Sequence, residues 1–133
     1  MHREEIMMAG YSVELEKATL DNTYFRKVLF TAPNSQLVLM ALKPGEEIGT
    51  ETHADTDQFI RIESGEGKAL IGGQEFTLKD GTAIVIPAGA EHNVINTSKK
   101  AALKLYTIYT PPEHPDGTIH KTKAEAQAAH HEH

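Results

Sequence analysis

The stretch of residues 81–96 reads GTAIVIPAGAEHNVIN. Its β-branched start, residues 82–86, is stopped by Pro87, which cannot donate a hydrogen bond to a sheet ladder. A short turn around Gly89 then reverses the chain, so that His92 begins a returning strand close to where the first strand ended. Because alternate residues of a strand share a face, His92 and every second residue after it point to the same side. This stretch predicts a hairpin that carries one histidine on a defined face.

Short β-compatible runs separated by turn signals surround this hairpin. The pair Gly72-Gly73 between two of these runs is the signal of a two-residue hairpin turn. Runs at roughly ten-residue spacing favour an all-β sandwich or barrel over a fold in which strands alternate with helices. The runs that we expect to form core strands are 36–43, 47–53, 58–63, 68–71, 74–78, 82–86, 92–96 and 101–109.

The two ends of the chain differ from this core. Residues 13–31 are expected to form one or two outer strands. Residues 122–125 read TKAE, which matches a capping box and predicts a short C-terminal helix. At 133 residues the chain is long enough for one compact domain and too short for two ordinary ones. We therefore expect a single domain over 1–133, with the barrel core at about 36–109 and a C-terminal turn and helix at 111–133.

The composition limits the partners that the protein can have. A net charge of -6 with scattered basic residues argues against a nucleic-acid surface or an anionic membrane, both of which need clustered cations. The absence of cysteine removes disulfides and thiolate zinc sites, and it fits a reducing cytoplasm. No apolar stretch has the length of a membrane span, and the residues after Met1 lack a signal-peptide layout. We expect a cytoplasmic protein that binds small molecules, metal ions or a second copy of itself.

Several histidines lie outside the core runs. His130, His131 and His133 end the chain, where they are compatible with a native sequence or with an added tag. The segment Pro111–Gly117 is expected to form a rigid turn outside the barrel, and a metal site built from His114 and His120 is a minor alternative to a structural role. We therefore expect the site to lie in the core.

The spacing of the opening stretch is that of a known motif. It runs glycine, five residues, proline, one residue, glycine, two residues, histidine, three residues, asparagine, which is the second motif of the cupin superfamily. The first cupin motif runs glycine, five residues, His-x-His, three or four residues, glutamate, six residues, glycine. This sequence keeps that frame from Gly45 to Gly65 and retains His53, but it places Glu51 in the first histidine slot and Gln58 in the glutamate slot. The chain resembles a small single-domain cupin.

The resemblance implies a double-stranded β-helix, the cupin jelly-roll barrel, in which Glu51, His53, Gln58 and His92 converge on one divalent metal ion. The strand pattern agrees, because Glu51 and His53 are two residues apart and share a face. A three-residue spacing would place Asp57 in the slot of Gln58 but would lose the closing glycine. Two imidazoles, one carboxylate and one amide oxygen suit Mn, Fe(II), Ni, Co or Zn. Two alternatives stay open: Glu51 pairs with His53 or faces solvent without metal, and Gln58 is a polar group that never touches metal.

The resemblance leaves the activity open, because one fold hosts many chemistries. Our first hypothesis is a non-redox metalloenzyme, an isomerase or lyase, acting on a small polar oxygenated substrate such as a sugar derivative or hydroxy acid. The metal would act as a Lewis acid, and Glu51 would be the catalytic group that moves a proton. An iron-dependent dioxygenase using two histidines and one carboxylate is the second hypothesis. A non-catalytic small-molecule-binding cupin is the third. We also expect a homodimer, with residues 105–112 as a candidate seam.

Overall fold

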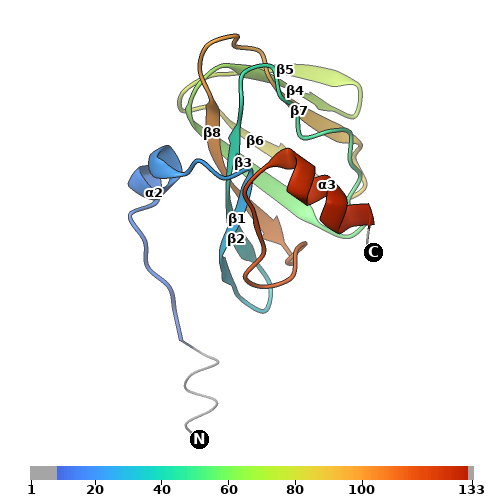
Figure 1. Cartoon of the computed structure of the whole chain (residues 1–133). Helices are drawn as coiled ribbons and strands as arrows, with labels where there is room; N and C mark the ends of the chain where they lie inside the picture. The colour runs from blue at the N-terminus through green and yellow to red at the C-terminus, as the bar shows by residue number, and fades with distance from the viewer. Residues whose placement is uncertain (1–8, 132–133) are drawn as a thin grey trace, which may run out of the picture.

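A computed structural model of the chain describes residues 9–131, with side chains up to residue 129. Two antiparallel sheets enclose the core, and a short helix lies near each end of the described chain (Figure 1). This arrangement confirms the predicted all-β fold with a C-terminal helix. The larger sheet has the order β6-β3-β8-β2-β1-β9, with β1 (Arg26–Thr31), β2 (Gln36–Leu42), β3 (Asp57–Ser64), β6 (Ala83–Ile86), β8 (Leu103–Thr110) and β9 (Ile119–His120). The smaller sheet has the order β5-β4-β7, with β4 (Gly67–Ile71), β5 (Gln74–Leu78) and β7 (His92–Asn96).

Alternation along the strands decides which side chains reach the interior. In β3 and β8 every second residue is buried, so the apolar members of both strands pack toward the smaller sheet. Burying such side chains is the main source of stability, at about 0.8 kcal/mol for each buried methylene group. The same alternation turns Gln58, Thr107 and Tyr109 inward. The interior is therefore apolar over most of its length and polar at one end.

The prediction of strands over 13–31 is correct for β1 and wrong for the residues before it. Leu15–Asp21 form helix α2, which lies against β8 and β3. Its sequence LEKATLD consists largely of good helix formers and lacks the period of two that a half-buried strand needs. An ion pair from Lys17 Nζ to Asp21 Oδ2 at 2.7 Å, one helical turn apart, adds to this local preference.

The predicted strand 47–53 also differs from expectation, in a way that shapes the site. It contains only two isolated bridges to β7, Glu47 to Ile95 and Glu51 to His92. Between them Gly49 adopts a φ of +106° and donates its N–H to Asn93 Oδ1 at 2.9 Å. Glycine takes this conformation without the steric cost that other residues bear. The irregularity interrupts the regular ladder and still leaves Glu51 directly opposite His92.

The C-terminal helix α3 (Lys123–His131) begins at the predicted capping sequence, with the glutamate bonded one residue before the N-cap threonine. The N–H of Glu125 donates to Thr122 Oγ1 at 3.1 Å, and Glu125 Oε1 accepts from the N–H of Lys121 at 2.9 Å. Neither helix within residues 9–131 has the length and apolar character that crossing a bilayer requires. The predictions for the residues after Met1 and for the side chains of the terminal histidines lie outside the described part of the chain.

The strand β8 was expected to contribute to a dimer seam. It lies in the middle of the larger sheet and is hydrogen-bonded along one edge to β2 and along the other to β3. Its backbone therefore has no free edge on which a second copy could add a strand. A homodimer with a seam at residues 105–112 stays a prediction, and it would have to use side chains rather than strand addition to β8.

Candidate metal centre

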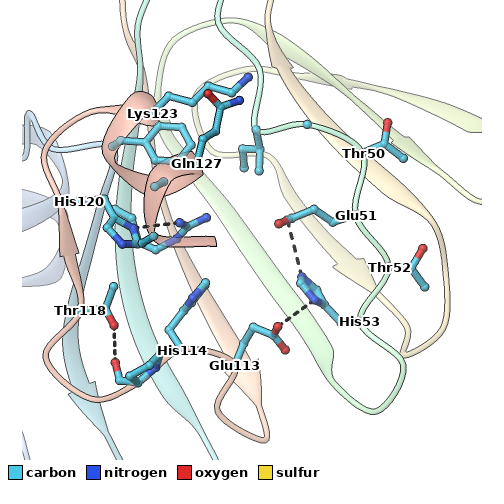
Figure 2. Close-up of a pocket in the computed structure, with 17 residues that line it drawn as sticks. Thr50, Glu51, Thr52, His53, Glu113, His114, Thr118, His120, Lys123 and Gln127 are labelled. Carbon is cyan, nitrogen blue, oxygen red and sulfur yellow. Dashed lines mark hydrogen bonds and ion pairs between the residues drawn. The ribbon is translucent and has the colours of Figure 1, made fainter. Parts of the chain in front are cut away.

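Glu51, His53 and His92 converge at the polar end of the barrel. Each offers one ligand atom, and these three atoms all lie within 4.8 Å of one another. The backbone sets this arrangement, because Glu51 and His92 exchange both of their N–H···O bonds, at 2.8 and 2.9 Å. Figure 2 shows the Glu51 carboxylate and the His53 ring turned toward each other, with 3.7 Å between Oε1 and Nε2. A cluster of two imidazoles and one carboxylate at this spacing could hold a metal ion.

The ring of His92 is buried, and its tautomer is set by a neighbouring carbonyl oxygen. Its Nδ1 lies 3.0 Å from the carbonyl oxygen of Ala90. A carbonyl oxygen only accepts, so Nδ1 carries the proton and the Nε2 atom of the neutral ring carries a lone pair. That Nε2 atom is buried with no hydrogen-bond partner among the described residues. Its arrangement is that of a histidine that ligates a metal and donates its other N–H to a carbonyl.

The ring of His53 has a similar environment. Glu113 Oε2 lies 3.2 Å from His53 Nδ1, and its negative charge favours a proton on that nitrogen (Figure 2). The Nε2 atom then carries the lone pair, and within the described part of the chain it is buried without a hydrogen-bond partner. Glu51 Oε1 lies 3.7 Å from that atom, which is beyond hydrogen-bond distance.

Gln58 supplies a third buried acceptor. Its Nε2 donates to Thr107 Oγ1 at 3.0 Å, and the Thr107 hydroxyl in turn donates to the carbonyl of Phe59 at 2.9 Å. This chain of bonds fixes the amide so that its Oε1 is the free atom, and Oε1 is buried with no partner among residues 9–131. An unpaired buried carbonyl costs about 1–3 kcal/mol. Gln58 as a metal ligand stays a prediction that this unpaired oxygen supports.

Gln58 also faces the same interior as the cluster. It lies directly across from Tyr109 on β8, and cross-strand partners share a face of the sheet. The Tyr109 ring in turn packs edge-on against the His53 ring, with 5.9 Å between centroids. The Nε2 atoms of His53 and His92 and the Oε1 atom of Gln58 are therefore buried acceptors without a hydrogen-bond donor among the described residues, and Glu51 adds a partly exposed carboxylate beside them. A divalent cation fits that chemistry.

A cavity of about 660 Å³ opens beside the cluster (Figure 2). Glu51 and His53 lie on one side of it, and His120 lies across from them. Helix α3 covers another side with small and polar residues. His92 and Gln58 are not among the lining residues and lie deeper in the barrel. A small molecule in this cavity would contact Glu51 and His53 rather than His92 and Gln58.

Comparison with known proteins shows the family to which this chain belongs. The model of the cupin domain, Cupin_2, matches residues 38–109, more than half of the chain. The chain is a cupin. It is 48% identical over 125 residues to the uncharacterized protein YrkC of Bacillus subtilis (strain 168), covering 90% of this chain and 67% of that one. It is 52% identical over 112 residues to the uncharacterized protein L612 of Acanthamoeba polyphaga mimivirus, covering 82% of this chain and 70% of that one.

A solved structure is similar over nearly the whole cupin. The crystal structure of BH2720 from Bacillus halodurans superimposes with a TM-score of 0.88 at 43% sequence identity. The match covers 91% of this chain and 96% of that one. It therefore extends beyond both ends of the matched cupin domain. Such a similarity establishes the fold of the cupin beyond its core motifs.

The sequence did not indicate that Glu113 belongs to the site. Residues 111–117 were expected to form a turn outside the barrel, whereas they fold back over its polar end. Buried Gln36 holds them there: its Nε2 donates to the carbonyl of His114 at 2.7 Å, and its Oε1 accepts from the N–H groups of Glu113 and His114 at 3.2 and 3.0 Å. The one available signal was a glutamine at an inward position of an otherwise apolar strand.

His114 and Tyr109 are uncharged neighbours of the cluster. Burial, followed by the positive charge of Arg26, lowers the pKa of His114 to about 3. Burial raises the pKa of the Tyr109 hydroxyl above its ordinary value. The two groups lie 3.4 Å apart, from His114 Nε2 to Tyr109 Oη. At neutral pH these two groups therefore add no charge to the surroundings of the cluster.

Proposed function

We propose that this cupin binds one divalent metal ion through Glu51, His53 and His92, with Gln58 as a further oxygen ligand. We further propose that it is a non-redox metalloenzyme, an isomerase or lyase, acting on a small polar oxygenated substrate such as a hydroxy acid or sugar derivative. One observation carries the metal proposal: His53 Nε2, His92 Nε2 and Gln58 Oε1 are all buried acceptors without partners among the described residues. Buried polar atoms in native proteins are rarely left unpaired without a functional reason.

In this proposal the residues of the cluster bind the metal ion, and one of them also reacts with the substrate. A bound divalent ion would supply Lewis-acid chemistry, polarising a substrate oxygen and stabilising negative charge on it. The His53 side chain is 10% exposed and that of Glu51 is 34% exposed, so Glu51 is the member of this pair more open to the cavity. A carboxylate has two oxygens, and one of them can accept a substrate proton while the other remains in the cluster. Glu51 is therefore the proposed catalytic residue.

Glu113 is a positioning residue in this proposal. Its carboxylate beside His53 Nδ1 favours the ring form that presents Nε2 to the cluster, and it raises the basicity of that atom. Gln36 fixes the backbone of Glu113 and so holds the carboxylate in place. Helix α3 and residues 113–115 line the cavity and reduce its contact with water, which strengthens the electrostatic effect of every charge inside.

A second candidate function has one specific observation in its favour. The three residues whose ligand atoms gather within 4.8 Å are two histidines and one carboxylate, the set found in many iron(II) oxygenases. In that case the cupin loaded with Fe(II) would consume oxygen in the presence of its substrate. An oxygen electrode distinguishes this dioxygenase from the isomerase or lyase.

The test uses protein reconstituted separately with Mn, Fe(II), Co, Ni and Zn under nitrogen. Proton NMR would follow a panel of hydroxy acids, sugar acids and sugar phosphates. We expect conversion without an oxidant, and a loss of at least about 100-fold in His92→Ala and Glu51→Gln, since each removes a group required in the transition state.

Glu91→Gln, in which an exposed carboxylate next to His92 is neutralised, is the matched control and should keep full activity. Oxygen uptake with Fe(II) would contradict the isomerase or lyase proposal and support the dioxygenase. Saturable binding of a panel compound, with no turnover by any metal form, would contradict the enzyme proposal and support a non-catalytic binding cupin.

A further inference from the structure

The cavity holds a buried positive charge that the proposed metal centre does not use. Arg26 lines the cavity and is only 7% exposed. Among the side chains that the structure describes, no carboxylate oxygen lies within 4.0 Å of its guanidinium group. Its Nε atom is buried and has no hydrogen-bond partner among them. Taking an unpaired ion out of water is unfavourable, so a buried arginine without an acid is a feature that needs a reason.

The known partners of Arg26 are neutral. Its Nη1 lies 3.2 Å from Nδ1 of His120, and its Cζ lies 5.2 Å from the centre of the Phe25 ring. A guanidinium only donates, so Nδ1 of His120 accepts and the proton of that ring is on Nε2. Burial, together with the positive charge of Arg26, lowers the pKa of His120. His120 is therefore a neutral ring with one N–H left to donate.

The sheet holds these two residues rigidly. Arg26 is the first residue of β1, His120 is the last residue of β9, and the two are direct cross-strand partners. Cross-strand partners share a face, and here that face is a wall of the cavity. Figure 2 shows His120 across the cavity from Glu51 and His53. A ligand that reaches both walls would have one end at the metal cluster and the other at Arg26.

We propose that Arg26 and His120 form an anion-binding subsite that receives a carboxylate or phosphate group of the substrate. The Nε edge of a guanidinium presents its N–H groups as a fork that matches the two oxygens of such a group. The subsite deepens the proposed function by naming the substrate class, and it rests on that function only for the statement that the bound anion is a substrate.

The charge and size of the cavity agree with an anionic ligand. The carboxylates of Glu51 and Glu113 contact His53, and within the described residues neither pairs with Arg26. Lys123 adds a second positive charge to the lining. These two carboxylates and two cations balance, so a bound divalent ion would leave an excess of positive charge. A volume of about 660 Å³ also lies within the range of small-molecule sites, about 300–1,000 Å³.

The experiment measures anion binding to the metal-free protein, so that an anion cannot bind through the metal. Protein labelled with ¹⁵N and stripped of metal is titrated with sodium phosphate, with sodium glycolate and with the neutral analogue ethylene glycol. The Nε–Hε cross peak of Arg26 is followed by NMR. We expect that peak to shift saturably with at least one of the two anions and not with ethylene glycol. The stronger of the two anions then distinguishes a phosphate from a carboxylate substrate.

Variants show whether the guanidinium itself is responsible. Arg26→Gln should weaken anion binding at least about tenfold, the loss expected when a charged hydrogen-bonding partner is removed. Arg26→Lys keeps the charge but loses the fork, and should weaken binding by a smaller factor. Lys100→Gln removes an exposed positive charge from the loop before β8 and should leave the affinity unchanged. If Arg26→Gln does not fold, the cross peak of the unaltered protein decides the question.

The failures of the two proposals are distinguishable. An Arg26 peak that responds to neither anion, or equal affinity in Arg26→Gln and the unaltered protein, would overturn the subsite even if the protein binds metal. Anion binding by a protein that takes up no metal would support the subsite and remove the metalloenzyme proposal. Metal binding should be the same in Arg26→Gln as in the unaltered protein, because Arg26 is not part of the metal cluster.

Discussion

The rings of His53 and His92 lie with their centroids 5.1 Å apart and their planes tilted by 52°. They come from different segments, His92 from the start of β7 and His53 from the irregular segment that pairs with it. In each ring the Nδ1 atom faces an oxygen of the protein, and the Nε2 atom is buried without a partner in the described chain. Two buried lone pairs beside a carboxylate form a site that a cation would stabilise.

Neutralising Glu113 tests its positioning role. In Glu113→Gln the negative charge beside His53 Nδ1 is lost, so the ring is held less firmly in the form that binds metal. We expect the affinity for Co²⁺ or Zn²⁺ to fall about 10- to 100-fold, the usual effect of removing such a partner, with the fold retained. Isothermal titration calorimetry measures the change. Asp116→Asn, an exposed acid in the same turn, is the control, and equal affinities for both variants would exclude the role.

Two substitutions at position 58 test whether Gln58 is a ligand. A carboxylate binds divalent cations more tightly than an amide oxygen, so Gln58→Glu should raise the metal affinity and Gln58→Leu should lower it, each by about tenfold. Gln74→Leu, at an exposed position on β5, controls for the loss of an amide. Competition with a fluorescent chelator would measure all of the affinities. Unchanged affinity in both variants at position 58 would leave Gln58 a structural residue.

The buried His114 predicts a dependence of stability on pH. Its folded pKa of about 3 lies below the ordinary histidine value of 6.5, so between these values the unfolded state binds more protons than the folded state. Stability from this group is present above the unfolded pKa and is lost as the pH falls below it. Between pH 7 and pH 5 the metal-free protein should lose about 1–2 kcal/mol through His114. Urea unfolding measures the loss, and His114→Gln should reduce it; an equal loss in both proteins would show that His114 is not responsible.

The core of the fold could be predicted because its signals are local. The alternation in β3 and β8, the turn at Gly72-Gly73 and the capping box at the start of α3 each need only neighbouring residues. The glycine that ends the motif from Gly45 to Gly65 is required for a steric reason. Gly65 has a φ of +118°, and a Cβ atom there would lie 2.8 Å from the carbonyl oxygen of Ala102. Helix α2 was not predicted because its seven residues make only about two turns, too few to show a helical period clearly.

The site could be predicted only in part, because some of its contacts join segments that are far apart in the sequence. The convergence of Glu51, His53 and His92 follows from two motifs and the face that each strand presents. The contributions of Glu113 and Arg26 depend on contacts between distant segments. The bond from Gln36 to His114 spans 78 residues, and that from Arg26 to His120 spans 94. Nothing in the neighbouring sequence indicates such contacts.

The measurement that tests the account most directly is the metal content of the folded protein. Protein exposed to Mn, Fe(II), Co, Ni or Zn and then passed through a desalting column is analysed by mass spectrometry under native conditions and by elemental analysis. The account predicts about one divalent ion per chain for the unaltered protein, and less than about a tenth of that for a folded His53→Ala/His92→Ala double variant. No retained ion with any of the five metals, or equal retention by the double variant, would contradict it.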